Sequence, residues 1–135
     1  CVVGYNTEIA RSYVGDDCWF HSNYVGDAVM GNDVSFGAGA ICANLRLDEK
    51  EISSGMENSG RTKLGPILGD HIRVGVHTSL MPGVRIGSNT MIASGLVIAQ
   101  DIAVDSFVSG KMELKISKNT AGLDSSGRTK MKGKL

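Results

Sequence analysis

The sequence predicts an all-β fold, a parallel β-helix built from hexapeptide repeats. Three observations predict it. An aliphatic residue recurs at every sixth position over residues 68–98, and the residue that follows it is nearly always small. The 135-residue chain also contains 18 glycines but only 5% aromatic residues. A core of small aliphatic side chains around many tight turns is expected from this composition, which disfavours a helical bundle.

The second half of the chain keeps the six-residue period without interruption. A helix of 3.6 residues per turn would not hold one face apolar at this spacing. We expect triangular coils, in which each hexapeptide forms one short strand, the aliphatic residue points inward and its small neighbour lets the backbone turn the corner. Met81 is the exception among the small neighbours. The inward positions are Leu68, Val74, Leu80, Ile86, Ile92 and Ile98.

The first half follows the same rule with some sides shortened to five residues. Segments such as VGDD, VGDA, MGND and FGAG carry the small or polar residues that tight corners need. The inward positions expected here are Val3, Ile9, Val14, Phe20, Val25, Met30 and Phe36. Three hexapeptides are expected to complete one coil in both halves.

The chain is expected to divide into a β-helix over residues 1–110 and a basic C-terminal tail over 111–135. A charged run rich in glycine and serine, residues 44–66, interrupts the repeats and predicts an extruded loop. So long an excursion usually has a function. The tail segment SSGRTKMKG at 125–133 resembles NSGRTKLG at 58–65 within the loop, and we have no physical account of this duplication.

Charge and composition narrow the functional classes. Residues 1–110 contain 7 basic and 12 acidic residues, whereas 111–135 contain 7 and 2. Without interleaved aromatics this tail does not indicate nucleic-acid binding. No membrane span, signal peptide or CxxC pair is found, so a cytoplasmic protein with three reduced cysteines is expected. Because residue 1 is Cys rather than Met, we expect the chain to be a fragment or a processed product.

Two segments resemble one family. They are FHSNYVGDAVMGNDVSFGAGAICANLRLDEK at 20–50 and LGPILGDHIRVGVHTSLMPGVRIGSNTMIASGLVIAQDI at 64–102. Both are similar to the acetyltransferase domain of bifunctional sugar-1-phosphate nucleotidylyltransferase/glucosamine-1-phosphate acetyltransferases, especially the archaeal-type branch. The resemblance implies a left-handed β-helix, a homotrimer, acetyl-CoA as donor and an active site between subunits. No glycine-rich nucleotide-binding segment is present, so pyrophosphorylase activity is not assigned to these residues.

The resemblance also implies roles for individual residues. His21 falls at the family's general base, Tyr24 at a tyrosine that contacts the sugar phosphate, Asn44 at an asparagine that holds the sugar, and Lys50 at a sugar-phosphate lysine. The chain departs from the family pattern elsewhere. Ser35 stands where bacterial enzymes have a second asparagine, Phe20 replaces a proline, and Ala10 and Arg11 replace a lysine pair. These changes bear on the identity of the acceptor more than on the chemistry.

The residue types fit acyl transfer to an amine. This reaction needs a base for the amine proton, and histidine, with a reference pKa of ~6.5, suits that role. Asn44 can both donate and accept hydrogen bonds, which suits a sugar hydroxyl or the acceptor nitrogen. Cations on the loop can bind a doubly charged phosphate, unless Asp48, Glu49 and Glu51 pair with them instead. The candidate cations are Lys50 first, then Arg46 and Arg11, with Arg61 and Lys63 nearby.

The acyl donor is expected in a groove between neighbouring coils, where corner backbone groups can approach a pantetheine arm. In the alternative interpretation these residues only form corners. The candidates for donor binding are Gly37, Ala38, Gly39, His77 and Ser94. The basic tail is a further candidate, for covering the phosphates of coenzyme A.

Two other functions stay open at this point. The chain could be a non-catalytic assembly or regulatory β-helix of a sugar nucleotidylyltransferase. It could also bind zinc through His21, His71 and His77, as β-helices of the γ-carbonic anhydrase type do. His71 and His77 are six residues apart and should diverge on successive sides of the coil, so no metal is expected.

Overall fold

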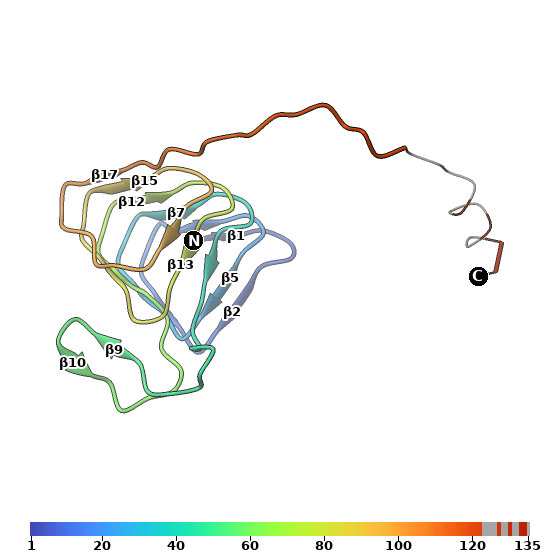
Figure 1. Ribbon diagram of the computed structural model, residues 1–135. Coiled ribbons are helices and arrows are strands. Elements are labelled where there is room, and N and C mark those ends of the chain that lie inside the picture. The colour runs from blue at the N-terminus through green and yellow to red at the C-terminus, as the bar shows by residue number, and fades with distance from the viewer. Residues whose placement is uncertain (123–126, 128–129, 131–132, 135) are drawn as a thin grey trace.

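The computed structural model describes residues 1–122, 127, 130 and 133–134. The described chain forms a left-handed parallel β-helix with a triangular cross-section, as Figure 1 shows. The prediction of this fold class is confirmed. We name its three sheets face A, face B and face C in chain order, and the turns between them the A–B, B–C and C–A edges.

Each face is a stack of short parallel strands, one from each coil. Face A contains β1 (Val2–Val3), β4 (Trp19–Phe20), β7 (Val34–Phe36), β12 (Ile72–Val74), β15 (Thr90–Ile92) and β17 (Phe107–Val108). Face B contains β2 (Glu8–Ala10), β5 (Tyr24–Gly26), β8 (Ile41–Cys42), β13 (Ser79–Leu80) and β16 (Val97–Ile98). Face C contains β3 (Tyr13–Val14), β6 (Val29–Met30), β11 (Ile67–Leu68) and β14 (Arg85–Ile86).

The core includes most of the inward positions that the period predicted. All six inward residues of the second half are at most 5% exposed. Two positions in the first coil differ from the expectation: Val3 is 51% and Ile9 is 38% exposed. Val3 pairs in register with buried Phe20 and Ile9 with buried Val25, so the local pattern is kept but burial is not.

The small residue after each inward position has a different role from the one expected. At Gly75 the backbone is not in the left-handed region, but an added Cβ would lie 2.5 Å from the amide nitrogen of Ser94 in the next coil. The left-handed residue lies two positions later, at His77, with φ of 53°. The small residue therefore lets coils stack closely, and the residue two positions on turns the corner.

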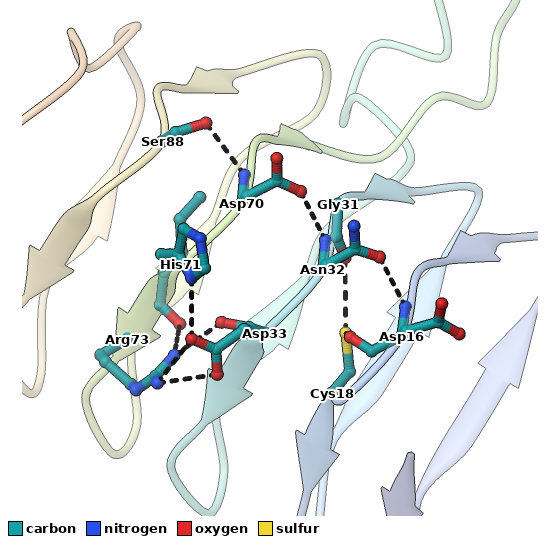
Figure 2. A network of polar contacts seen from close by, with 10 residues as sticks. Asp16, Cys18, Gly31, Asn32, Asp33, Asp70, His71, Arg73 and Ser88 are labelled. Carbon is teal, nitrogen blue, oxygen red and sulfur yellow. Dashed lines mark hydrogen bonds and ion pairs between the residues drawn. The ribbon is translucent and has the colours of Figure 1, made fainter.

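Side chains at the C–A edge tie successive coils together, as Figure 2 shows. The amide of Asp16 donates to Asn32 Oδ1 at 2.8 Å, and the amide of Asn32 donates to Asp70 Oδ1 at 2.7 Å. The amide of Asp70 in turn donates to Ser88 Oγ at 3.0 Å. This ladder satisfies corner amides that the parallel sheets leave unpaired.

The chain leaves the coils between β8 on face B and β11 on face C. It forms an antiparallel hairpin of β9 (Ser53–Ser54) and β10 (Glu57–Asn58), which projects from the coils in Figure 1. The excursion is anchored at Ile52, which is 1% exposed and contacts the coil beside Gly83. After β17, residues 109–122 run away from the coils in an extended conformation. None of the described residues forms a helix long and apolar enough to cross a membrane.

Candidate active site

The A–B edge carries the predicted base and the predicted donor-binding residues. β4 pairs with β7 and β7 with β12, so the turns that follow these strands stack on one another. The amide of Gly39 donates to the carbonyl of Ser22 at 2.9 Å, and that of His77 donates to the carbonyl of Ala38 at 3.0 Å. The structure thus places the following residues along one edge: His21, Gly37, Ala38, Gly39, His77 and Ser94.

His21 is exposed in the turn after β4, and its backbone is held on both sides. Its amide donates to Asn23 Oδ1 at 2.8 Å, and its carbonyl accepts from Thr7 Oγ1 at 3.0 Å. Its ring stacks on Trp19 with 5.8 Å between ring centroids. Within the described residues neither ring nitrogen has a hydrogen-bond partner, so both can meet a ligand.

Asn23 supports this turn and was not singled out from the sequence. It is 5% exposed, and its Nδ2 donates to the carbonyls of Gly37 at 2.9 Å and Ala40 at 3.0 Å. One side chain therefore joins the turn of His21 to the turn of Gly37 in the next coil. The signal in the sequence was an asparagine two residues after His21, because asparagine side chains in turns often hydrogen-bond to nearby backbone groups.

A second polar cluster lies at the B–C edge. The pairing of β2 with β5 and of β5 with β8 stacks Arg11, Asp27 and Asn44 in one column. Arg11 binds Asp27 through two hydrogen bonds, Nε to Oδ1 at 2.7 Å and a terminal nitrogen to Oδ2 at 2.8 Å. Asn44 Nδ2 donates to Asp27 Oδ2 at 2.5 Å and to the Tyr24 hydroxyl at 3.1 Å. Three of these four residues were predicted, and Asp27 was missed.

The two clusters lie at opposite ends of the same face. β5 runs along face B from the turn of His21 to the corner at Asp27. The ring of Tyr24 lies along this face over Gly26, where an added Cβ would come within 2.5 Å of the tyrosine hydroxyl. Across the part of the chain that the structure describes, no hydrogen bond or ion pair joins His21 to the B–C cluster. A substrate contacting both must extend along face B.

Comparisons with known proteins identify relatives of this chain. The chain is 39% identical over 110 residues to a bifunctional sugar-1-phosphate nucleotidylyltransferase/acetyltransferase of Sulfurisphaera tokodaii, covering 78% of this chain and 27% of the relative. It is 41% identical over 120 residues to a bifunctional protein GlmU of Methanococcus maripaludis, covering 86% and 29%. The match lies in the C-terminal portion of these relatives. The chain is thus similar to the C-terminal portion of these bifunctional proteins over most of its own length.

Solved structures of hexapeptide-repeat acetyltransferases share its fold. Serine acetyltransferase of Neisseria gonorrhoeae has a TM-score of 0.60 at 25% identity, over 78% of this chain and 39% of that one. The H141A mutant of GDP-perosamine N-acetyltransferase from Caulobacter crescentus, in complex with CoA and GDP-perosamine, has a TM-score of 0.55 at 19% identity, over 78% and 48%. No family model matches the sequence. The chain spans less than a third of the length of the curated relatives named above.

The loop cations Arg46 and Lys50 differ in availability. Arg46 is held by Asp48 through two hydrogen bonds of 2.8 and 2.7 Å, and this contact lowers the pKa of Asp48 to about 2. The amide of Lys50 donates to the same carboxylate at 3.3 Å. The ammonium group of Lys50 makes no ion pair among the residues that the structure describes. Lys50 is therefore the more available cation of the two.

A hollow of about 540 Å³ lies where the loop leaves the coils after β8. Its lining is mostly apolar and includes Ala43, Leu45 and Met81, with Arg46 at its border. It lies beside Asn44 at the B–C edge. The hollow therefore adjoins the polar cluster rather than His21.

The three histidines of the chain do not meet. His71 lies at the C–A edge, where its Nδ1 is 2.9 Å from Asp33 Oδ2, as Figure 2 shows. His21 and His77 lie two coils apart at the A–B edge. Over the described residues no group of three His, Cys, Asp or Glu side chains is placed to hold a metal ion.

Electrostatics keep Asp27 ionised. The hydrogen bonds from Arg11 lower the pKa of this carboxyl most, burial opposes them, and the hydrogen bond from Asn44 lowers it further. Lys63 on the loop adds a smaller effect in the same direction. The pKa of Arg11 is correspondingly raised by its contact with Asp27. At neutral pH the pair is thus a carboxylate and a guanidinium.

We expect the Asp27→Asn variant to be less stable than wild type by about 1.5 kcal/mol at pH 7, the lower end of the range for a hydrogen bond to a charged group. Because the folded-state pKa of Asp27 lies below its ordinary value of 3.8, the ionised carboxylate stabilises the fold above that pH. This stabilisation is lost as pH falls through the lowered pKa. Thermal unfolding from pH 7 to about pH 2 measures the difference.

The control for this prediction is Asp17→Asn. Asp17 is exposed and makes no ion pair within the described part of the chain. Its variant should show no difference from wild type that changes with pH. A constant deficit in Asp27→Asn down to the lowest pH would show that the charge of Asp27 does not stabilise the fold.

Proposed function

We propose that this protein is an N-acetyltransferase that transfers the acetyl group of acetyl-CoA to the amine of an amino-sugar 1-phosphate, with His21 as general base. The observation that carries the proposal is the placement of His21. Neither nitrogen of its exposed ring has a hydrogen-bond partner among the described residues, and its turn leads directly into β5, which carries Tyr24 of the B–C cluster. The names of the curated relatives, which include acetyltransferase, support the same chemistry.

The proposed reaction needs one proton acceptor. The amine nitrogen attacks the thioester carbonyl, a C–N bond forms, and a ring nitrogen of His21 takes the proton that the amine loses. The oxyanion then collapses, the C–S bond breaks, and the sulfur of coenzyme A leaves with a proton returned from the imidazolium. The products are the N-acetyl sugar phosphate and free coenzyme A, so His21 ends unchanged.

The acceptor is proposed to lie along face B with its phosphate toward the loop. Lys50 is the first phosphate ligand in this proposal because its ammonium group is available. Arg46 could join it only by giving up Asp48, and Arg11 is already held by Asp27. Asn44 and Tyr24 would contact the sugar. Glucosamine 1-phosphate and galactosamine 1-phosphate are the two acceptors to test first.

The donor is proposed to lie along the A–B edge, beside Gly37, Ala38, Gly39, His77 and Ser94. The imidazole of His77 lies against Gly39, where an added Cβ would be 2.7 Å from its Cε1. A side chain at position 39 would therefore displace His77 and block this edge. The related perosamine enzyme was solved with CoA, which supports a thioester donor for this fold.

A cytoplasmic homotrimer is proposed as the working state. Large apolar side chains face outward on each of the three faces, for example Trp19 at 50% exposure, Tyr13 at 68% and Val97 at 67%. Such exposure of apolar surface is typical of association sites. A molar mass three times that of the 14.2-kDa chain is expected in solution.

The experiment that tests this function is thiol release from acetyl-CoA with a panel of amino-sugar 1-phosphates. The corresponding sugar 1-phosphates without an amine are the matched controls. Release that requires the amine supports N-acetylation. If the folded oligomer releases no thiol with any acceptor, the catalytic proposal is wrong, and an assembly or regulatory β-helix is the better account.

A further inference from the structure

We propose that Asp27 is a positioning residue that orients the side-chain amide of Asn44, with the NH2 group turned inward and the carbonyl oxygen turned toward the acceptor. The orientation follows from contacts within this chain. Its use in acyl transfer depends on the proposed function. Asp27 itself touches neither the acceptor nor the donor in this proposal.

The first step is that Asp27 can only accept hydrogen bonds from Asn44. An ionised carboxylate has no hydrogen to donate, so it must face the NH2 group of an amide and not its oxygen. Asn44 Nδ2 lies 2.5 Å from Asp27 Oδ2, which fits a hydrogen bond to a charged acceptor. Asp27 therefore excludes the flipped amide, in which two oxygens would meet.

The second step is that Asp27 is itself held in place. Its side chain is only 14% exposed, and Arg11 in the coil below binds both of its oxygens. Its backbone has a φ of 50°, in the left-handed corner conformation. Arg11, Asp27 and Asn44 come from three successive coils, so the stacking of the coils sets their order. The carboxylate thus presents Oδ2 to Asn44 from a fixed position.

The third step concerns the hydrogen-bonding groups of Asn44 and Tyr24 that remain available to a ligand. Both hydrogens of Asn44 Nδ2 are used, one by Asp27 and the other by the Tyr24 hydroxyl at 3.1 Å. Asn44 Oδ1 has no partner among the described residues and remains an acceptor. The Tyr24 oxygen accepts from Asn44, so its own hydrogen remains available to a ligand. The pair therefore presents one acceptor and one donor side by side.

This arrangement matches two neighbouring oxygen substituents on the sugar ring of the acceptor. One sugar hydroxyl can donate to Asn44 Oδ1 while the neighbouring oxygen accepts from Tyr24. With the amide reversed, Asn44 would offer a second donor in place of the acceptor, and the hydroxyl would have no acceptor for its hydrogen. The inference therefore assigns to Asp27 an indirect part in binding the sugar ring, whose amine the proposed function places at His21.

The test compares wild type with Asp27→Asn, in which residue 27 can meet either end of the Asn44 amide. We expect the KM for the amino-sugar phosphate to rise about 10-fold, as for loss of a charged hydrogen bond, while the KM for acetyl-CoA stays within about twofold. The matched control is Asp105→Asn. Asn89 Nδ2 donates to Asp105 at 2.7 Å between neighbouring coils at the C–A edge. Asp105→Asn therefore alters an equivalent asparagine–aspartate contact away from the site. Its kinetic constants should not change.

A second measurement does not depend on activity. The side-chain NH2 signals of Asn44 in a ¹⁵N–¹H spectrum should move in Asp27→Asn and should keep their positions in Asp105→Asn. If Asp27→Asn leaves these signals unmoved, or raises the KM values for both substrates equally, Asp27 does not position Asn44. If the signals move but wild type transfers no acetyl group, the orientation stands and the proposed function is wrong.

Discussion

Replacement of His21 by alanine is expected to lower kcat for acetyl transfer about 100- to 10,000-fold, the usual contribution of a general base. The substitution removes the only proposed group that takes the amine proton, while the amide that holds this turn through Asn23 is retained. The fold should therefore survive. Initial rates of thiol release, measured at saturating acetyl-CoA and amino-sugar phosphate, give the ratio directly.

Two controls make this result specific. His71→Ala removes an exposed histidine that contacts Asp33 at the C–A edge, and its kcat should stay within about twofold of wild type. Added imidazole should restore part of the activity of His21→Ala, because a free base can occupy the vacated space. Wild-type activity in a folded His21→Ala protein would exclude His21 as the base.

Replacement of Phe36 by alanine is expected to destabilise the fold by about 3–5 kcal/mol, the usual cost of removing a buried aromatic ring. Phe36 is fully buried and packs edge-to-face on Phe20, with 5.5 Å between ring centroids. Both rings lie in the narrow interior of adjacent coils, where neighbouring side chains on three sides cannot close a cavity of this size. The loss thus combines lost contacts with an unfilled cavity.

Urea unfolding at one protein concentration measures this change. Phe107→Ala is the matched control, because Phe107 is 69% exposed on the same face and should shift the unfolding free energy by less than about 0.5 kcal/mol. Equal effects of the two substitutions would show that Phe36 is not part of a rigid core. A changed dependence on urea would instead indicate a change in the unfolded or native state.

The sequence predicted the local features of the site better than its contacts. It put His21 and three of the four residues of the B–C cluster among the candidates. Asp27 was missed because its importance depends on partners 16 and 17 residues away. Asn23 was missed for the same reason, since it contacts a turn 14 residues further along the chain. A six-residue repeat does not reveal contacts between residues 14 to 17 positions apart in different coils.

The loop shows the same limit. Its charged composition indicated solvent exposure, but nothing in the repeat predicted that Ile52 would be buried against the coil at Gly83. Charge alone also did not decide which cation was available. Arg46 pairs with Asp48 two residues away, which leaves Lys50 as the available cation among those two. That outcome depends on the local path of the loop rather than on composition.

The sequence by itself determined which residues point inward and hence the β-helical fold. An aliphatic residue at every sixth position is a local signal for the inward side chains, because each side of the triangular coil repeats the same short strand and corner. Only the tertiary structure decided which polar corner residues meet, since that depends on the register in which whole coils stack. This register depends on the summed lengths of the sides of each coil, which are five or six residues long. The position of Arg11 below Asp27, and of Asp27 below Asn44, is therefore a property of three coils together and not of any one repeat.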